Sequence, residues 1–165
     1  MALTRINNQA LTNVTSAGII SSLPAGSIIQ TKVYGQSSTV TATTDGNTAT
    51  GISLQITPTF QNSKFLITLT GGSQHNNSSS AQGVTSLYRS IGSGSATFIK
   101  YLDAHFDQSM RLPHSGAYYD TPDTTSQITY YLYGRERGAG HSYHIHQNEG
   151  GISGIMYFIV QEIKQ

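Results

Sequence analysis

Two histidines separated by a single residue are the part of this sequence best suited to metal chemistry. His144 and His146 flank Ile145. If they lie on a β-strand, positions i and i+2 share a face, so both imidazoles point the same way. Neutral imidazole suits Fe, Ni or Zn, which makes the pair a candidate transition-metal site. The two histidines are also simply the polar strand face opposite Tyr143 and Ile145, and we favour this interpretation over a metal site.

Acidic residues form a second candidate cation site. Calcium needs six to eight oxygen ligands, which carboxylates on one strand face and on a following loop could partly supply. A solvated face opposite Leu102, Ala104 and Phe106 explains the same pattern with fewer assumptions, and we favour it. The residues concerned are Asp103, His105 and Asp107 on the expected strand and Asp120 and Asp123 on the expected loop.

Tyrosine is enriched in this chain, which has ten tyrosines and no tryptophan. The tyrosine side chain combines apolar area with a polar tip, which suits wet interfaces and stacking on sugar rings. Aromatic residues also favour strands whatever their role, so the two explanations remain open. The candidates for glycan binding or for an interface are Tyr118, Tyr119, Tyr131 and Tyr133.

Recognisable catalytic signatures are missing from the sequence. It contains no Gly-x-Ser-x-Gly elbow and no phosphate-binding glycine loop followed by lysine, and its eight acidic residues fit no known motif. We therefore expect a protein that is not an enzyme and carries no cofactor.

Composition narrows the classes further. The 165 residues suffice for one domain with a real core, and the absence of cysteine rules out a disulfide framework. A net charge of +1 argues against strong binding to nucleic acid or anionic membranes. No apolar run approaches the roughly 18 residues that span a bilayer. Residues 1–9 lack the apolar region of a secretory signal, so we expect a soluble protein of the cytoplasm in which it is made.

Short runs with a two-residue apolar period dominate residues 27–164, as in Ile52-Ser53-Leu54-Gln55-Ile56. This period predicts strands, and turn residues between them indicate an antiparallel sandwich. We expect an all-β, jelly-roll-like β-sandwich with long loops at 71–83 and 110–123. The expected strands are 27–34, 40–44, 48–57, 64–70, 84–89, 97–106, 126–133, 141–146 and 152–163.

Residues 1–26 differ from this body, which we place at 27–165. They are rich in Asn, Thr, Ser and Ala and end at the turn Pro24-Ala25-Gly26. Such a segment has too little apolar content to fold alone. It is either a frayed terminus or an extended anchoring arm that docks on a partner. Its candidate partner-binding residues are Leu3, Ile6, Leu11, Val14, Ile19 and Ile20.

Several segments of the body resemble a recurring module of bacteriophage virion proteins. The pattern includes a start similar to 27–30 (SIIQ), then 50–58 (TGISLQITP) and 62–67 (NSKFLI). It continues with Leu87-Tyr88-Arg89, with 120–126 (DTPDTTS) and with a closing strand similar to 151–163. The resemblance covers most of residues 27–163, but it consists of strand and turn motifs, and the histidine-rich stretch 141–146 departs from it.

Members of this family are tail-fibre-like or unassigned virion proteins, so the resemblance implies a homotrimeric β-sandwich located in the virion and assembled in the host bacterial cytoplasm. On a three-fold axis, three copies of His144 and His146 would offer six nitrogens to one metal. Because 165 residues leave no shaft, we expect a capsid decoration (cement) protein that binds the major capsid protein through its arm. The alternative is a small tail-fibre or receptor-binding subunit that attaches to a tail adaptor protein and recognises host glycans.

Overall fold

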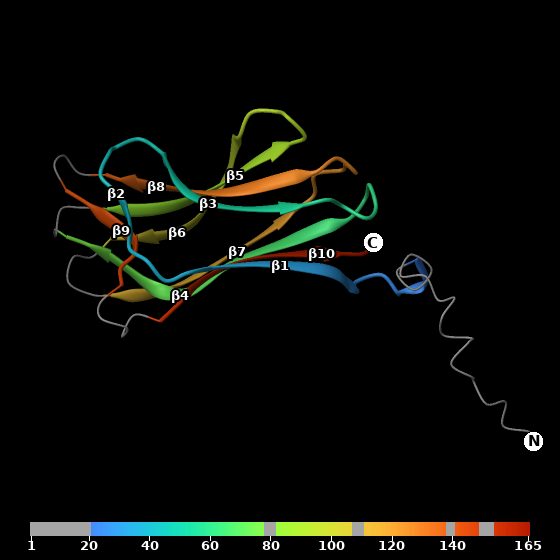
Figure 1. Cartoon of the computed structure of the whole chain (residues 1–165), viewed down its shortest axis with the longest axis horizontal. Helices are drawn as coiled ribbons and strands as arrows, with labels where there is room; N and C mark the ends of the chain where they lie inside the picture. Colours follow the sequence, from blue (N-terminus) through green and yellow to red (C-terminus); the bar gives the residue numbers. More distant parts are fainter. Residues whose placement is uncertain (1–20, 78–81, 107–110, 138–140, 149–153) are drawn as a thin grey trace, which may run out of the picture.

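Two antiparallel β-sheets stacked face to face make up the body of the protein (Figure 1). A computed structural model describes residues 21–77, 82–106, 111–137, 141–148 and 154–165. The strands are β1 (Ile28–Gln36), β2 (Val40–Ala42), β3 (Thr48–Ile56), β4 (Lys64–Asn76), β5 (Gly83–Ile91), β6 (Thr97–His105), β7 (Leu112–Asp120), β8 (Ile128–Glu136), β9 (Tyr143–His146) and β10 (Met156–Ile163).

The strand order is that of a jelly roll. The smaller sheet has the order β3-β8-β5-β6. In the larger sheet β4 is central: β10 and β7 pair with it, β1 pairs with β10, and the short strands β9 and β2 extend its far end. Because the chain passes repeatedly from one sheet to the other, neighbouring strands are distant in sequence, as in a double Greek key. The expected all-β, jelly-roll-like sandwich is therefore confirmed.

The core fills the space between the sheets and comes from alternate residues of each strand. From the larger sheet, Phe65, Ile67 and Leu69 of β4 are completely buried. From the smaller sheet, Leu87 of β5 and Leu132 of β8 meet them with at most 1% of their surface exposed. Each such side chain contributes about 1.5–3 kcal/mol when it leaves water. The two-residue period seen in the sequence is the period of this burial.

Strand β4 continues beyond the predicted strand 64–70, so the prediction of a loop from residue 71 is wrong at its start. Gly71 and Gly72 have φ values of 71° and 64°. Glycine adopts this backbone region without steric cost and so allows a bulge inside the strand. The pairing with β7 shifts between Gly71 and Gln74, and β4 then runs on to Asn76. A glycine pair that looked like a strand end is a bend within one strand.

Strand β7 replaces most of the loop predicted at 110–123. Its inward-facing residues include His114 and Asp120, which are buried, and Gly116 lies beneath the carbonyl oxygen of Leu102, with which a Cβ would collide. Because the buried face of this strand is otherwise polar or without a side chain, with Tyr118 as its one large ring, it shows no apolar alternation. The prediction failed since hydrophobic periodicity was the signal used to find strands.

A buried carboxylate fastens the last strand to the connection between β3 and β4. Glu162 of β10 is fully buried. Its Oε1 accepts hydrogen bonds from the Thr59 backbone N–H and the Ser63 hydroxyl, both at 2.6 Å. Its Oε2 accepts from Gln30 Nε2 at 2.6 Å and from the Thr59 hydroxyl at 3.0 Å. Four donors thus compensate the desolvation of one charge.

Replacing Glu162 by Ala should lower the free energy of unfolding by about 3 kcal/mol, because four buried or partly buried hydrogen bonds lose their acceptor. Urea denaturation followed by circular dichroism measures this loss. The matched control is Gln161→Ala on the opposite face of β10, for which a change of at most about 0.5 kcal/mol is expected. Equal effects of the two substitutions would show that the hydrogen bonds of Glu162 contribute little.

Candidate interaction surface

The outer face of the smaller sheet carries a cluster of aromatic side chains. Alternation along β8 sends Leu132 inward and leaves Tyr131 and Tyr133 on the outer surface. On β5 the same alternation buries Leu87 and places Tyr88 outward. We call Tyr88, Phe98, Tyr101, Tyr131 and Tyr133 together the aromatic face.

Ring contacts order this aromatic face. The rings of Tyr88 and Tyr133 are stacked, with centroids 4.1 Å apart and an interplanar angle of 28°. Phe98 of β6 meets the Tyr88 ring edge-on at 5.7 Å, and its own ring lies 4.9 Å from that of Tyr101. Phe98 and Tyr101 nevertheless remain 45% and 49% exposed. Contiguous exposed rings of this kind mark interaction sites in soluble proteins.

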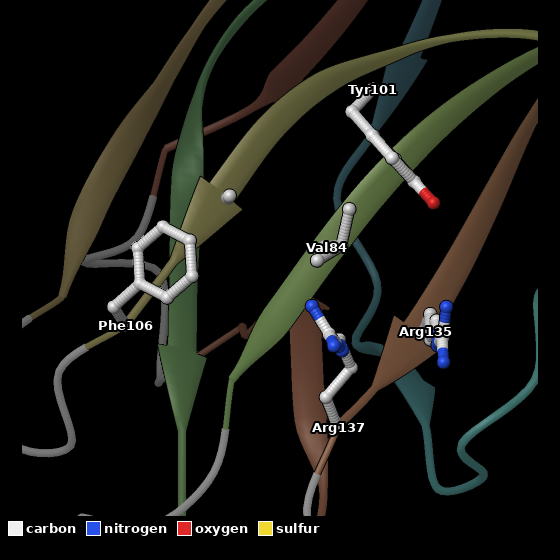
Figure 2. Close-up of a pocket in the computed structure, with 6 residues that line it drawn as sticks. Val84, Tyr101, Phe106, Arg135 and Arg137 are labelled. Atoms are coloured by element: carbon white, nitrogen blue, oxygen red, sulfur yellow. The ribbon is translucent and has the colours of Figure 1, made fainter.

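Two hollows flank the aromatic face. The first, of about 140 Å³, is formed by β5, β6 and the end of β8 and is shown in Figure 2. Its lining residues are Val84, Tyr101, Ala104, Phe106, Arg135 and Arg137. The second, of about 250 Å³, lies between β3 and β8 and is lined by Ala49, Gly51, Ile52, Ser53, Tyr131, Leu132 and Tyr133.

The two arginines of the first hollow differ in their partners. Asp45 Oδ1 accepts hydrogen bonds from Arg135 Nε at 3.0 Å and from Nη2 at 2.8 Å. This hydrogen bonding to Asp45 raises the pKa of Arg135. Arg137, in the part of the chain that the structure describes, forms no ion pair, and its guanidinium group points toward Val84 (Figure 2). Arg135 is therefore already neutralised, whereas Arg137 offers a positive charge to a partner.

The four tyrosines selected from the sequence do not lie together. Tyr131 and Tyr133 belong to the aromatic face, but Tyr118 and Tyr119 lie on β7 in the other sheet. Tyr118 packs against the core, and Tyr119 is 46% exposed with the Lys64 ammonium 5.7 Å from its ring centroid. Their proposed role in glycan binding or at an interface stays a prediction.

Other residues of this surface were missed in the sequence, namely Tyr88, Phe98, Tyr101 and Phe106. The strand that carries Tyr88 was predicted, so the outward positions of β5 could have identified this residue. Phe98, Tyr101 and Phe106 could not be placed in the same way, because β6 has an irregularity at Ile99 and, between Tyr101 and Phe106, another at Leu102.

This irregularity reverses the faces of β6 that the sequence predicted. Tyr101 pairs with Ser86 and Asp103 with the next residue, Thr85, so Leu102 is an extra residue that bulges. Since one extra residue flips every later side chain to the other face, Asp103 and His105 turn inward. His105 is 1% exposed, whereas Phe106 is 63% exposed. The interpretation of 103–107 as a solvated face is wrong for His105, and Asp107 lies outside the described residues.

Asp103 takes part in a polar network with residues of other strands, and its role in a calcium site stays a prediction. Its Oδ2 lies 2.9 Å from His114 Nδ1 and accepts a hydrogen bond from Gln74 Nε2 at 3.1 Å. His114 Nε2 lies 2.7 Å from the backbone oxygen of Ile145. His114 thus bridges the Asp103 carboxylate of β6 and the backbone of β9.

The carboxyl of Asp103 is held in its charged form by these partners. Burial alone would raise its pKa. The hydrogen bond and charge of His114, with the backbone N–H groups of Ser115 and Ala104, outweigh burial and lower the pKa. The other acidic candidate, Asp120, lies six residues from His114 along β7, roughly 20 Å away in an extended strand. There it pairs with Arg89 at 2.7 Å and accepts a hydrogen bond from the Tyr130 hydroxyl at 2.7 Å.

His144 and His146 both lie on β9, but a register shift separates their partners Thr41 and Val40 on β2, and their surroundings differ. The His144 ring stacks on His75 with centroids 5.9 Å apart, and its Nδ1 lies 2.9 Å from the Thr41 hydroxyl. His146 is fully buried, so the interpretation of a solvent-facing polar strand is wrong there, and Ser73 N–H donates to its Nδ1 at 3.3 Å. Burial lowers the pKa of both histidines. Among the described residues no three metal-ligating side chains gather, and the metal site stays a prediction.

The strand order places the chain among the jelly-roll β-sandwiches. No protein-family model and no curated protein matches the chain. Similar solved structures include the infectious bursal disease virus Gx strain, with 13% identity and a TM-score of 0.47 over 83% of this chain and 37% of that one. The VP2 subviral particle of the same virus has 12% identity and a TM-score of 0.45 over 83% and 40%. This chain thus spans about two fifths of their length.

No helix among the described residues is both long and apolar enough to cross a bilayer. The arm residues Leu3, Ile6, Leu11, Val14, Ile19 and Ile20 lie outside the described residues, and their role in partner binding stays a prediction.

Replacing Asp103 by Asn should cost about 2 kcal/mol at pH 6, since His114 loses a charged partner. The pKa of Asp103 is lowered in the folded state, so its stabilisation is complete above the unfolded-state value near 3.8 and disappears as the pH falls through the folded value. The stability difference between wild type and Asp103→Asn should therefore shrink below about pH 4. Urea titrations at pH 6 and pH 3 measure it, with the exposed Asp123→Asn as control. A difference that does not change with pH would contradict the assignment.

Proposed function

We propose that this protein is a virion structural protein, a capsid decoration subunit that attaches to the outside of a larger protein shell. The observation that carries the proposal is the aromatic face, an ordered and exposed surface on a sandwich whose core is already complete. Support also comes from the resemblance of residues 27–163 to bacteriophage virion modules and from the jelly-roll topology.

In this proposal the body and the arm have separate tasks. The body forms a homotrimer and rests on the shell, and the arm of residues 1–26 binds the major capsid protein through its six apolar residues. The role is structural and not catalytic, and the site of action is the virion after assembly in the host bacterial cytoplasm. An arm that places its apolar residues on a partner adds contact area without enlarging the folded body.

A second candidate function is a small tail-fibre subunit that attaches to a tail adaptor protein and binds host glycans. The observation that favours it is the stack of Tyr88 on Tyr133, because exposed tyrosine rings also suit sugars. Purified protein should then adsorb to host cells and block infection, and labelled virions should carry it at the tail. A decoration protein should be found on heads and should leave adsorption unchanged.

Replacing the six apolar arm residues by Ser should release the protein from heads and leave the oligomer intact, because the docking contacts are lost but the sandwich is not. Sedimentation of heads with bound protein, together with size-exclusion chromatography of the free protein, measures both. The matched control replaces six polar residues of the same arm by Ser or, for Ser itself, by Ala: Asn7, Asn8, Gln9, Thr12, Asn13 and Ser16. If the variant that lacks the six apolar residues still binds heads fully, the proposed role of the arm is wrong.

A further inference from the structure

We infer that the hollow beside the aromatic face receives an apolar side chain of a partner protein. A carboxylate lies next to that side chain on the partner, so the docking surface of the partner is both apolar and acidic. The inference rests on the proposed docking role of the aromatic face and specifies the chemistry of what docks there. Its basis is the shape, lining and charge of the hollow.

The walls of the hollow are almost entirely carbon. Val84 and Ala104 contribute aliphatic carbon to the lining, and the exposed rings of Tyr101 and Phe106 contribute aromatic carbon. The volume of about 140 Å³ suits one aliphatic or aromatic side chain. A sugar would need several polar groups to replace its hydrogen bonds to water, and this lining supplies few. The hollow therefore favours an apolar side chain over a saccharide.

Charge complementarity indicates what must lie next to that side chain. Arg135 is engaged by Asp45, whereas the Arg137 guanidinium stands at the rim without an ion pair among the described residues. A carboxylate that approaches the rim would find a planar, bidentate donor in Arg137. The chain's own segment 1–20 cannot provide it, because its one charged side chain is that of Arg5. The occupant is therefore an acidic and apolar element of another protein.

The bulge at Leu102 places two of the residues that line the hollow on the outer face of the sheet. It turns Ala104 and Phe106 outward, next to Val84 in the register Val84↔Ala104. Without the extra residue, these two positions would face the core. The hollow thus lies where β6 changes face, beside Arg135 near the end of β8 and Arg137 just beyond it.

Small probes test the chemistry directly on the full-length protein. In NMR titrations, N-acetyl-L-leucine should shift the amides of Val84 and Ala104, and N-acetyl-L-leucinamide, which lacks the carboxylate, should bind about fivefold more weakly. Arg137→Gln should abolish this preference and Arg137→Lys should largely keep it. Ala104→Leu should block both probes by filling the hollow. Equal binding of the two probes, no binding, or no effect of Arg137→Gln would overturn the inference, as would stronger binding of glucuronate, which would indicate a sugar site.

Binding to heads separates this inference from the proposed function. If both hold, Arg137→Gln and Ala104→Leu should each weaken head binding several-fold, while Arg137→Lys and the exposed control Lys100→Gln should not. If the wild-type protein does not bind heads, the decoration function fails whatever the probes show. If it binds heads and the two variants bind equally well, the hollow is not part of the docking surface and the inference fails although the function stands.

Discussion

The extra residue Leu102 in β6 determines which side chains of residues 103–106 face the core and which lie on the outer surface. Register shifts lie at Ile99 and at Leu102, and beyond Leu102 the side chains lie on the faces opposite to those that the sequence predicts. The bulge sends Asp103 and His105 into the space between the sheets. It also sends Phe106 to the surface beside the aromatic face. The polar end of the core and the hollow on the surface are therefore two results of one backbone irregularity.

The inward-turned carboxylate of Asp103 is tolerated because other strands supply hydrogen-bonding partners. Asp103 binds His114 of β7 and Gln74 of β4, and the Tyr143 hydroxyl donates to Gln74 Oε1 at 2.9 Å. Thr85 of the smaller sheet then contacts the same hydroxyl at 2.9 Å. This chain of contacts links the two sheets where their apolar core ends. A hydrogen-bonding partner offsets the free-energy cost of burying a polar group in such a place.

The opposite end of the sandwich is fastened in a similar way. Arg89 of β5 donates to both carboxylate oxygens of Asp120 on β7 at 2.7 Å. The Tyr130 hydroxyl also donates to Asp120, and burial together with the Asp120 charge raises the pKa of this hydroxyl. An apolar centre with polar ties at its ends defines one register for the two sheets. Apolar packing alone would specify register less strictly, because one branched side chain replaces another at small cost.

The sequence was sufficient for the fold class and for most strands, because their buried faces are apolar and alternate. It failed where burial does not coincide with hydrophobicity. Strand β7 buries His114 and Asp120, and β4 continues through two glycines, so neither shows the usual pattern. The bulge at Leu102 has no local signature either, and it misdirected every expectation for residues 103–106. Such features depend on partners far away in the chain, which a reading of local periodicity does not contain.

The aromatic face suits docking because its rings are already ordered by their mutual contacts. A side chain that is already ordered loses little conformational freedom on association, and Tyr88 is held by Tyr133 and Phe98 before any partner arrives. Tyr131 is similarly placed, with its hydroxyl 3.2 Å from that of Ser90. Asp45 already holds Arg135. Of the two arginines that line the hollow, Arg137 is therefore the one available to pair with a carboxylate of a partner. A charge at the rim of an ordered apolar surface contributes more to the orientation and rate of encounter than to affinity. The rigid rings would then provide most of the binding energy, and Arg137 would select among apolar partners the one that also carries a carboxylate.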